Sequence, residues 1–359
     1  MSETAVALIT GFPRLLARGL AIYGLRRSSK NRVVLFVSKD SEDDAKSFIS
    51  ELSPGQQKRA RIVVGQLESI DLGLSGREVS KLLDSVTHIF HPAGVAGGPK
   101  RQQAKHLNGL NRMLNLAREC TYLKRFSLFS TAFVSGDRTG IISEEELDVG
   151  QSLRTPYEEA MQMAEHMARS AMPRIPITVL RPSAMIGHSK TGDASGLTEG
   201  PSYLLSLMLR MPSEMPVFLP GSGVVPFNIV PIDYVVRASW SLASDPVALG
   251  RTFHLTDPNP VSTRQAFELF ADIANRPAPR FDKWAIGAIS RLISAVGLEN
   301  IVPSAPSLVG DLTQHVTYSC SGTLERLADT EIRCPPFEEY ADTLVRWMAD
   351  VERSSRGRV

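Results

Sequence analysis

The sequence predicts an α/β fold built on a doubly wound parallel sheet, followed by a smaller lobe. Three observations support this prediction. Short apolar runs of strand length alternate with longer segments of helical pattern through the first half of the chain. Such alternation is typical of parallel sheets with helices on both faces. The first apolar run leads through a glycine turn into a helix, and after Pro182 the alternation loosens.

The first unit of the chain is the most informative. Ala5–Ile9 is an apolar run that predicts a buried strand, and Arg14–Tyr23 predicts a helix. The turn between them consists of Thr10, Gly11, Phe12 and Pro13. A strand, a glycine turn and a helix in this order form the phosphate cradle of dinucleotide-binding folds. Such a cradle also has a glycine where Arg14 stands and a small residue where Ala17 stands, so one of these two conditions is met.

Five more buried strands are expected in the first half of the chain. They are Arg32–Ser38, Arg61–Gly65, His88–Gly94 with its exit turn, Arg125–Ser130, and Ile177–Leu180, which should stop at Arg181-Pro182. Two long helices are predicted over Gln102–Ala117 and Thr155–Met172. The second begins with a Thr-Pro pair, which fits the N-cap and the first position of a helix. Residues 1–182 are therefore predicted to form one dinucleotide-binding core.

Residues 183–351 predict a mixed region that completes the sheet edge and forms a substrate-side lobe. Its expected elements are a loop over Gly187–Pro201, a helix over Pro201–Met211, a strand over Phe227–Val230, a helix over Pro231–Leu242 and a strand over Arg251–Thr256. The polar segment that begins at Glu352 predicts a disordered tail over residues 352–359.

Composition narrows the class of protein. The 359 residues are 43% hydrophobic and 22% charged, which is ordinary for a globular chain, and the net charge of +2 gives no reason to expect nucleic-acid binding. Three cysteines (Cys120, Cys320 and Cys334) have neither disulfide nor metal-site spacing, so we expect no metal and a reducing, cytoplasmic location. We expect no signal peptide and no transmembrane segment.

Several motifs occur in order between residues 5 and 240. They are Asp71–Ser75 after the third strand, Ser130–Gly136 after the fifth, Glu146–Gln151 leading to Pro156–Glu158, Arg181–Ser183, and Val230–Val235. In this combination the chain resembles the extended short-chain dehydrogenase/reductases. Within them it is most similar to the thioester-reductase and fatty acyl-CoA reductase-like branch. The resemblance implies a Rossmann-type fold and a nicotinamide dinucleotide cofactor.

The resemblance also implies a catalytic set. It places Thr131 as the hydroxyl that hydrogen-bonds the substrate carbonyl and Tyr157 as the general acid. The family's lysine, four residues after the tyrosine, lowers the tyrosine pKa and binds the nicotinamide ribose, but Met161 stands at that position. A thioether carries no charge and donates no hydrogen bond. A free tyrosine has a pKa of about 10, so only about one molecule in a thousand is ionised at pH 7.

Cofactor positions depart from the family pattern as well. Gln66 replaces an aspartate that contacts adenine, and Arg14 projects toward the pyrophosphate. Arg14 either blocks that space, swings outward into a surface ion pair, or contacts a phosphate directly. Lys39 suits a 2′-phosphate, which favours NADP over NAD if a dinucleotide binds, or is simply a solvated lysine. Ala93 and Pro182, at two strand ends, complete the implied cofactor set.

These departures lead to a first hypothesis and two rivals. The first is a catalytically impaired homologue that acts by binding a ligand or a protein partner. The second is an active NADP-dependent reductase of a carbonyl or acyl thioester with a hydrophobic chain, which needs a replacement cation near Tyr157. The third is a structural subunit of a larger assembly. The apolar segment Trp284–Leu298 is either a lid helix, or the wall of an acyl-chain groove or a docking face.

Overall fold

The computed structural model describes residues 4–92, 100–197, 200–210, 214–282, 310 and 312–356. Ala93 and the segment Trp284–Leu298 lie outside the described residues, so the predictions made for them stay predictions.

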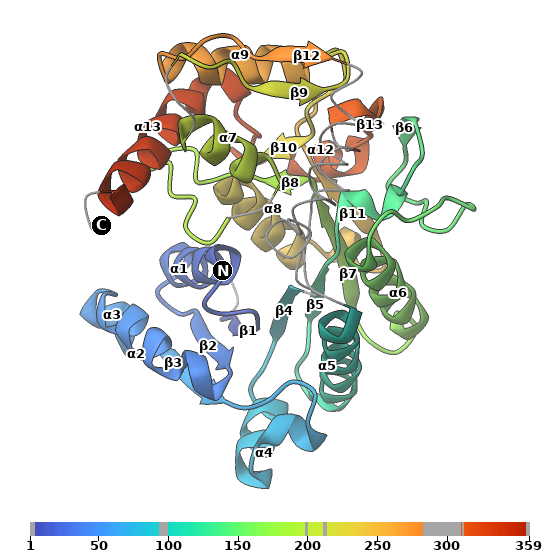
Figure 1. The fold of residues 1–359 in the computed structure, drawn as a ribbon. Helices are drawn as coiled ribbons and strands as arrows, with labels where there is room; N and C mark the ends of the chain where they lie inside the picture. Colours follow the sequence, from blue (N-terminus) through green and yellow to red (C-terminus); the bar gives the residue numbers. More distant parts are fainter. Residues whose placement is uncertain are drawn as a thin grey trace.

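A seven-stranded sheet forms the centre of the molecule, and every pair of neighbouring strands in it is parallel (Figure 1). Its strand order is β11-β7-β5-β4-β1-β2-β3, which confirms the predicted doubly wound fold. The strands are β1 (Val6–Ile9), β2 (Arg32–Val37), β3 (Ala60–Val64), β4 (His88–Pro92), β5 (Arg125–Phe129), β7 (Ile177–Pro182) and β11 (Thr252–Leu255).

Helices cover both faces of this sheet (Figure 1). One face packs against α1 (Leu15–Arg27), α2 (Glu42–Ser50) and α8 (Ile232–Ser244). The opposite face packs against α4 (Gly76–Leu83), α5 (Lys100–Glu119) and α6 (Pro156–Ala171). Short elements join these layers: α3 (Pro54–Gln57), η1 (Lys39–Ser41), η2 (Ile70–Gly73), η3 (Ala132–Ser135) and η4 (Pro246–Ala248).

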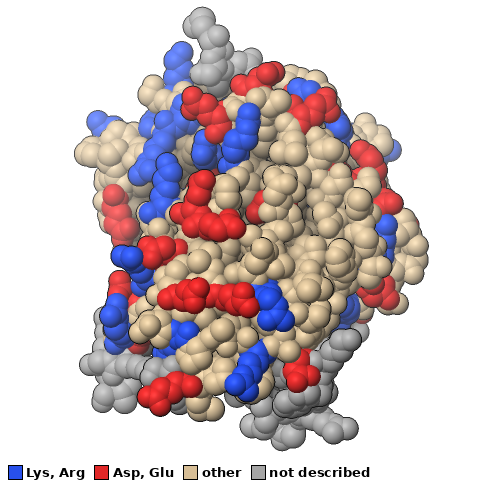
Figure 2. Space-filling model, turned by 90° about the horizontal axis from the view of Figure 1, so that it is seen from above, with Lys and Arg blue, Asp and Glu red and all other residues tan. Residues whose placement is uncertain are grey.

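A smaller lobe with its own apolar cluster lies beyond the carboxyl ends of the strands (Figure 1). It contains α7 (Gly200–Arg210), α9 (Thr263–Ile273), α13 (Phe337–Arg356) and the paired strands β9 (Phe218–Pro220) and β12 (Arg280–Asp282). Figure 2 shows this end of the molecule, where acidic and basic side chains are interspersed beside a broad uncharged area. This face therefore offers no extended surface of one charge to a nucleic acid.

Two further strand pairs connect the lobe to the core. β8 (Ala184–Met185) pairs with β10 (Ile229–Val230), and β6 (Gly140–Ile142) pairs with β13 (Val316–Tyr318). After β13 comes α12 (Ser321–Leu327). The buried carboxylate of Glu144 accepts hydrogen bonds from the backbone N–H groups of Gly322, Thr323 and His254. The last third of the chain is thereby bonded to the segment that follows β6.

Two sequence predictions are corrected here. Strand β7 does not stop at Leu180, because Arg181 and Pro182 stay in register with His254 and Leu255 of β11. The predicted disordered tail is wrong at its start, because α13 continues through Arg356. Glu352 anchors this last turn by accepting hydrogen bonds of 2.8 Å from Ser206 Oγ and from Arg210 Nε on α7.

The predicted division at residues 182 and 183 stays a prediction, although β11 and α8 from the second half do complete the central layers. Among the described helices, none combines the length and the apolar character needed to cross a lipid bilayer.

The contact between α1 and α8 depends on a glycine and gives a first testable prediction. A Cβ on Gly24 would overlap the Trp240 ring, which is fully buried. We expect Gly24→Ala to lower the free energy of unfolding by about 1–3 kcal/mol through overpacking, as urea denaturation would measure. The control is Gly76→Ala at the start of α4, where a Cβ meets no atom within 4 Å. This control should be neutral or stabilising by up to about 1 kcal/mol. Equal stabilities of the two variants would contradict the prediction.

Candidate functional site

The predicted site residues gather where the strands end. Ligands of open parallel sheets bind outside the carboxyl ends of the strands, beside the glycine turn after the first one. Gly11 follows β1, Thr131 follows β5, and Pro182 ends β7. Tyr157 lies in the first turn of α6, which packs against η3, the turn that begins after Thr131. The structure therefore brings the cradle and the proposed catalytic pair to one edge of the sheet.

The glycine turn has the shape of a phosphate cradle. Gly11 adopts φ +81°, a conformation that favours glycine, and a Cβ built on it would be tight against Cγ of Pro92 at 3.3 Å. Arg14 is the N-cap of α1, and its N–H donates to the Gly11 carbonyl at 3.2 Å. Phe12 is buried against Phe48, and Pro13 is exposed. The N-terminus of α1 therefore faces the space in which phosphates bind in this fold.

The Thr10 side chain is buried and engaged in a hydrogen bond. Its buried hydroxyl lies 2.9 Å from Nδ1 of His91 on β4. Burial lowers the pKa of His91 to about 3, so the ring is neutral at physiological pH. Thr10 therefore joins β1 to β4 beneath the cradle.

Arg14 is exposed at the mouth of the cradle and lies near His106 of α5. Burial lowers the pKa of His106, and the positive charge of Arg14 lowers it further. Nε2 of His106 is buried and has no hydrogen-bond partner among the described residues. An arginine and an unsatisfied imidazole nitrogen thus approach each other beside the glycine turn. All three alternatives for Arg14 stay predictions: obstruction of the pyrophosphate, an outward surface ion pair, and contact with a phosphate.

The two outer cofactor positions are at the surface. Lys39 is 83% exposed, and its ammonium pairs with the carboxylate of Glu42 at 2.5 Å. Gln66 is exposed, and its amide donates to Glu68 at 3.2 Å. In this structure Lys39 is therefore a solvated, paired lysine, and it would have to exchange Glu42 for a 2′-phosphate.

The two proposed catalytic hydroxyls differ in burial. Thr131 is 4% exposed, and its Oγ1 accepts a hydrogen bond of 3.3 Å from the Phe133 N–H, which leaves its own proton to donate elsewhere. Tyr157 is half-buried, and Thr155 caps its helix by accepting a 3.1 Å bond from the Glu158 N–H.

Met161 is part of the core. Its side chain is 1% exposed within the apolar cluster between the sheet and helices α5 and α6. The sheet-facing stripe of α6 also carries Glu158 and Glu165, both buried. Each carboxylate already has an arginine: Arg154 pairs with Glu158, and Arg181 and Arg169 pair with Glu165. The methionine is thus a packing residue, and it supplies no charge to Tyr157.

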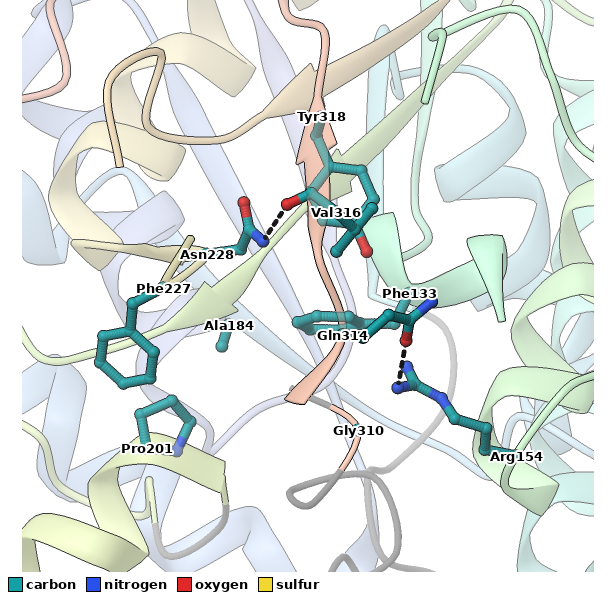
Figure 3. A pocket seen from close by; sticks show the side chains of 10 residues that line it. All are labelled: Phe133, Arg154, Ala184, Pro201, Phe227, Asn228, Gly310, Gln314, Val316 and Tyr318. Atoms are coloured by element: carbon teal, nitrogen blue, oxygen red, sulfur yellow. Dashed lines mark hydrogen bonds between the residues drawn. The ribbon is translucent and has the colours of Figure 1, made fainter. Parts of the chain in front are cut away.

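A small pocket lies between the core and the lobe, and its lining includes Phe133, two residues after Thr131, and Arg154, three residues before Tyr157 (Figure 3). Its apolar lining comes from Phe133, Ala184, Pro201, Phe227 and Val316, and its polar lining from Arg154, Asn228, Gln314 and Tyr318. Sequence reasoning missed the polar set. Its members are far apart along the chain and belong to no local motif, so no signal in the sequence points to them.

Two buried hydroxyls support binding of a polar group at this edge. Ser130 follows β5, Ser183 follows β7, and both are at least 96% buried without a hydrogen-bond partner among the described residues. Unsatisfied buried hydroxyls are costly unless a ligand or water pairs with them. With the Gly11 turn, they fit a dinucleotide lying across the strand ends. No group of three potential metal-ligating side chains occurs among the described residues.

The packing of Met161 gives a second prediction. We expect Met161→Lys to lower the free energy of unfolding by more than about 2 kcal/mol, because an ammonium would be buried beside carboxylates that are already paired. Met161→Leu keeps the volume and the apolar character and should cost less than about 1.5 kcal/mol. Urea denaturation of both variants measures this difference. A lysine variant as stable as the leucine variant would show that position 161 has access to solvent.

Comparison with solved structures places this geometry among reductase domains. The terminal reductase (R) domain of the myxalamid PKS-NRPS biosynthetic pathway superposes with a TM-score of 0.78 at 25% identity, covering 98% of this chain and 91% of that one. UDP-glucuronic acid 4-epimerase from Bacillus cereus, solved in complex with NAD, has a TM-score of 0.68 at 17% identity, covering 96% and 99%. At 17% identity, the likeness to the epimerase concerns the fold alone.

The curated relatives are longer than this chain. The Drosophila melanogaster protein CG8303, provisionally described as a fatty acyl-CoA reductase, is 24% identical over 266 residues, which is 62% of this chain and 48% of that protein. Aldehyde reductase lnaA of Aspergillus flavus is 27% identical over 213 residues, which is 54% of this chain and 19% of that protein. The chain thus spans about half the length of CG8303 and about a fifth of the length of lnaA.

These likenesses agree with the resemblance drawn from the strand-end motifs. The model of an NAD-binding domain family described as male sterility protein matches residues 9–239, and the chain belongs to this family.

Proposed function

We propose that this chain is a reductase-family protein that binds a nicotinamide dinucleotide and a hydrophobic acyl or carbonyl ligand but transfers hydride slowly. The observation that carries the proposal is Met161, which is 1% exposed in an apolar cluster where the family's proton relay has a cation. Ligand binding draws support from family membership, from the glycine turn and from the pocket beside Thr131. In this proposal the protein acts through the ligand or the protein partner that it binds.

The chain's own residues suggest how a dinucleotide would be held. The turn at Gly11 and the first N–H groups of α1 would receive the diphosphate, with Arg14 at the rim. NADP remains the proposed dinucleotide, since Lys39 could leave Glu42 for a 2′-phosphate. When bound, the cofactor supplies the hydride.

Thr131 and Tyr157 would polarise the substrate carbonyl that receives the hydride. Thr131 has a hydroxyl proton to donate to the carbonyl oxygen, and Tyr157 would donate to the same oxygen. General acid catalysis contributes about 10²–10⁴-fold when the pKa of the acid is matched to the working pH. In this proposal nothing replaces the family's lysine, whose position Met161 occupies inside the apolar cluster, so most of that factor is lost. The retained scaffold would then bind a substrate that it reduces poorly.

An active NADP-dependent reductase is the second candidate. The retained Thr131 and Tyr157 favour it, as do the reductases among the similar proteins. It requires a cation that assists Tyr157. Arg154 is the nearest arginine along the chain, but its guanidinium is bonded to Glu158 and Gln314. The slow form is our first proposal because Met161, at the position of the family's lysine, lies in an apolar cluster.

Single-turnover reduction by NADPH separates the two candidates. With an aliphatic aldehyde and an acyl-CoA as substrates, we expect Tyr157→Phe to lower a slow wild-type rate by less than about tenfold, because an unassisted phenol contributes little. An active reductase would lose about 10²–10⁴-fold in the same variant. A fast wild-type rate with a large loss would refute the first proposal.

Calorimetric titration with NADPH tests the cradle. If the Arg14 side chain obstructs the pyrophosphate, Arg14→Gly should tighten NADPH binding by about tenfold, since glycine serves well as an N-cap. The control is Arg18→Ala, which removes the same charge one turn further along α1, where Arg18 lies over the Phe48 ring. This control should change the affinity by less than about threefold. Weaker binding by the Arg14 variant would instead identify Arg14 as a phosphate ligand.

A further inference from the structure

Arg154 connects the helix of Tyr157 to a distant part of the chain. Its N–H donates to Oε2 of Glu158 at 2.7 Å, and its guanidinium lies 3.2 Å from Oε1 of the same carboxylate. The Glu158 side chain is 1% exposed and that of Arg154 is 16% exposed. Burial raises the pKa of Glu158, and Arg154 acts in the opposite direction. A buried carboxylate therefore fixes this guanidinium in one orientation.

The other edge of the guanidinium holds the strand that closes the pocket. Nη1 of Arg154 donates to Oε1 of Gln314 at 2.9 Å, and the Gln314 amide donates in turn to the carbonyls of Gly136 and Arg138. Figure 3 shows the guanidinium directed at the Gln314 amide from the far wall of the pocket. A Cβ on Gly310 would overlap the Arg154 guanidinium, so this arrangement requires glycine at position 310.

The lobe holds the same strand from the opposite side. Nδ2 of Asn228 donates to the Val316 carbonyl at 3.0 Å (Figure 3). On the core side, the Tyr318 hydroxyl lies 3.0 Å from Oγ of Ser135 in η3. Residues 312–318, called the bar below, contain the three lining residues Gln314, Val316 and Tyr318. Arg154 bonds this segment at Gln314, and Asn228 bonds it at Val316. Val316 of this bar and four apolar residues from other segments, Phe133, Ala184, Pro201 and Phe227, line the pocket together.

We propose that Arg154 is a positioning residue that holds residues 312–318 across the pocket and thereby limits the size of the acyl group admitted beside Thr131 and Tyr157. The inference rests on the proposed function for the nature of the ligand, but the clamp itself is a property of the chain alone. Loss of the guanidinium removes the bond to Gln314 and leaves the Glu158 carboxylate buried without its partner. The bar should then move away from the core and widen the pocket.

Hydrogen exchange tests the clamp without any ligand. In Arg154→Ala we expect the amides of residues 312–318 to exchange at least about tenfold faster than in the wild type, while β1, β4 and β5 keep their rates. The matched control is Arg169→Ala. Arg169 lies on α6, the helix that carries Glu158, and pairs with Glu165 at the same spacing of four residues, but its other bonds go to Glu145 and Thr252 and not to the pocket. Unchanged exchange in Arg154→Ala, or equal acceleration in the control, would overturn the proposal.

Binding measurements test the effect on specificity. Dissociation constants for butanoyl-, octanoyl- and dodecanoyl-CoA would be measured for the wild type, Arg154→Ala and Gly310→Ala. The last variant keeps every charge but displaces the guanidinium. In both variants the ratio of the dissociation constant of dodecanoyl-CoA to that of butanoyl-CoA should fall by at least about fivefold. The dissociation constant of NADPH should stay within about twofold of the wild-type value. General destabilisation would lower the binding-competent fraction for all ligands alike. Faster exchange with an unchanged ratio would overturn the role in specificity.

The two levels of inference fail separately. If the wild type binds none of the three thioesters, the proposed ligand class is wrong, and the exchange measurement still decides whether Arg154 holds the bar. If thioesters bind and exchange is unchanged, the proposed function stands and the clamp is refuted.

Discussion

The buried ion pair between Glu165 and Arg181 determines where helix α6 lies on the sheet. Both side chains are fully buried, and Oε1 of Glu165 lies 2.6 Å from Nη2 of Arg181 on β7. A second bond of 2.9 Å joins Arg181 Nε to the other carboxylate oxygen, so the contact is bidentate. Breaking such a pair typically costs about 3–5 kcal/mol, because it leaves one charge buried alone. Tyr157, Met161 and Arg154 take their positions from this helix, so the geometry of the site depends on the pair.

The sequence was sufficient for the sheet, because buried parallel strands are short apolar runs that turn-forming residues bound. It also singled out Gly11, Thr131 and Tyr157 as site residues, because they belong to motifs a few residues long, and their roles stay predictions. It was not sufficient for the contact between Arg154 and Gln314, whose partners are 160 residues apart and form no local pattern. The tail was misjudged for the same reason, since the last turns of α13 are held by Arg210 on a distant helix.

Two of the departures from the family pattern, at positions 14 and 161, differ in physical kind. Arg14 is an exposed side chain on the rim of a cradle whose glycine turn is intact. Met161 is a core residue between two buried carboxylates that already have partners. A surface arginine can rotate or be removed at little cost to packing, whereas a charge at position 161 has to be introduced into a closed interior. The second departure is therefore the harder one to reverse by a single substitution.

The bonds received by Glu144 constrain the order in which the protein can be completed. Its carboxylate lies in the segment after β6, but three of its four hydrogen-bond donors belong to Gly322 and Thr323. During synthesis, the Glu144 carboxylate is made before the midpoint of the chain and stays solvated until Gly322 and Thr323 have been made. The sheet edge at β11 therefore closes late, and a nascent chain that has finished every central strand is still unable to bury this carboxylate at its final position.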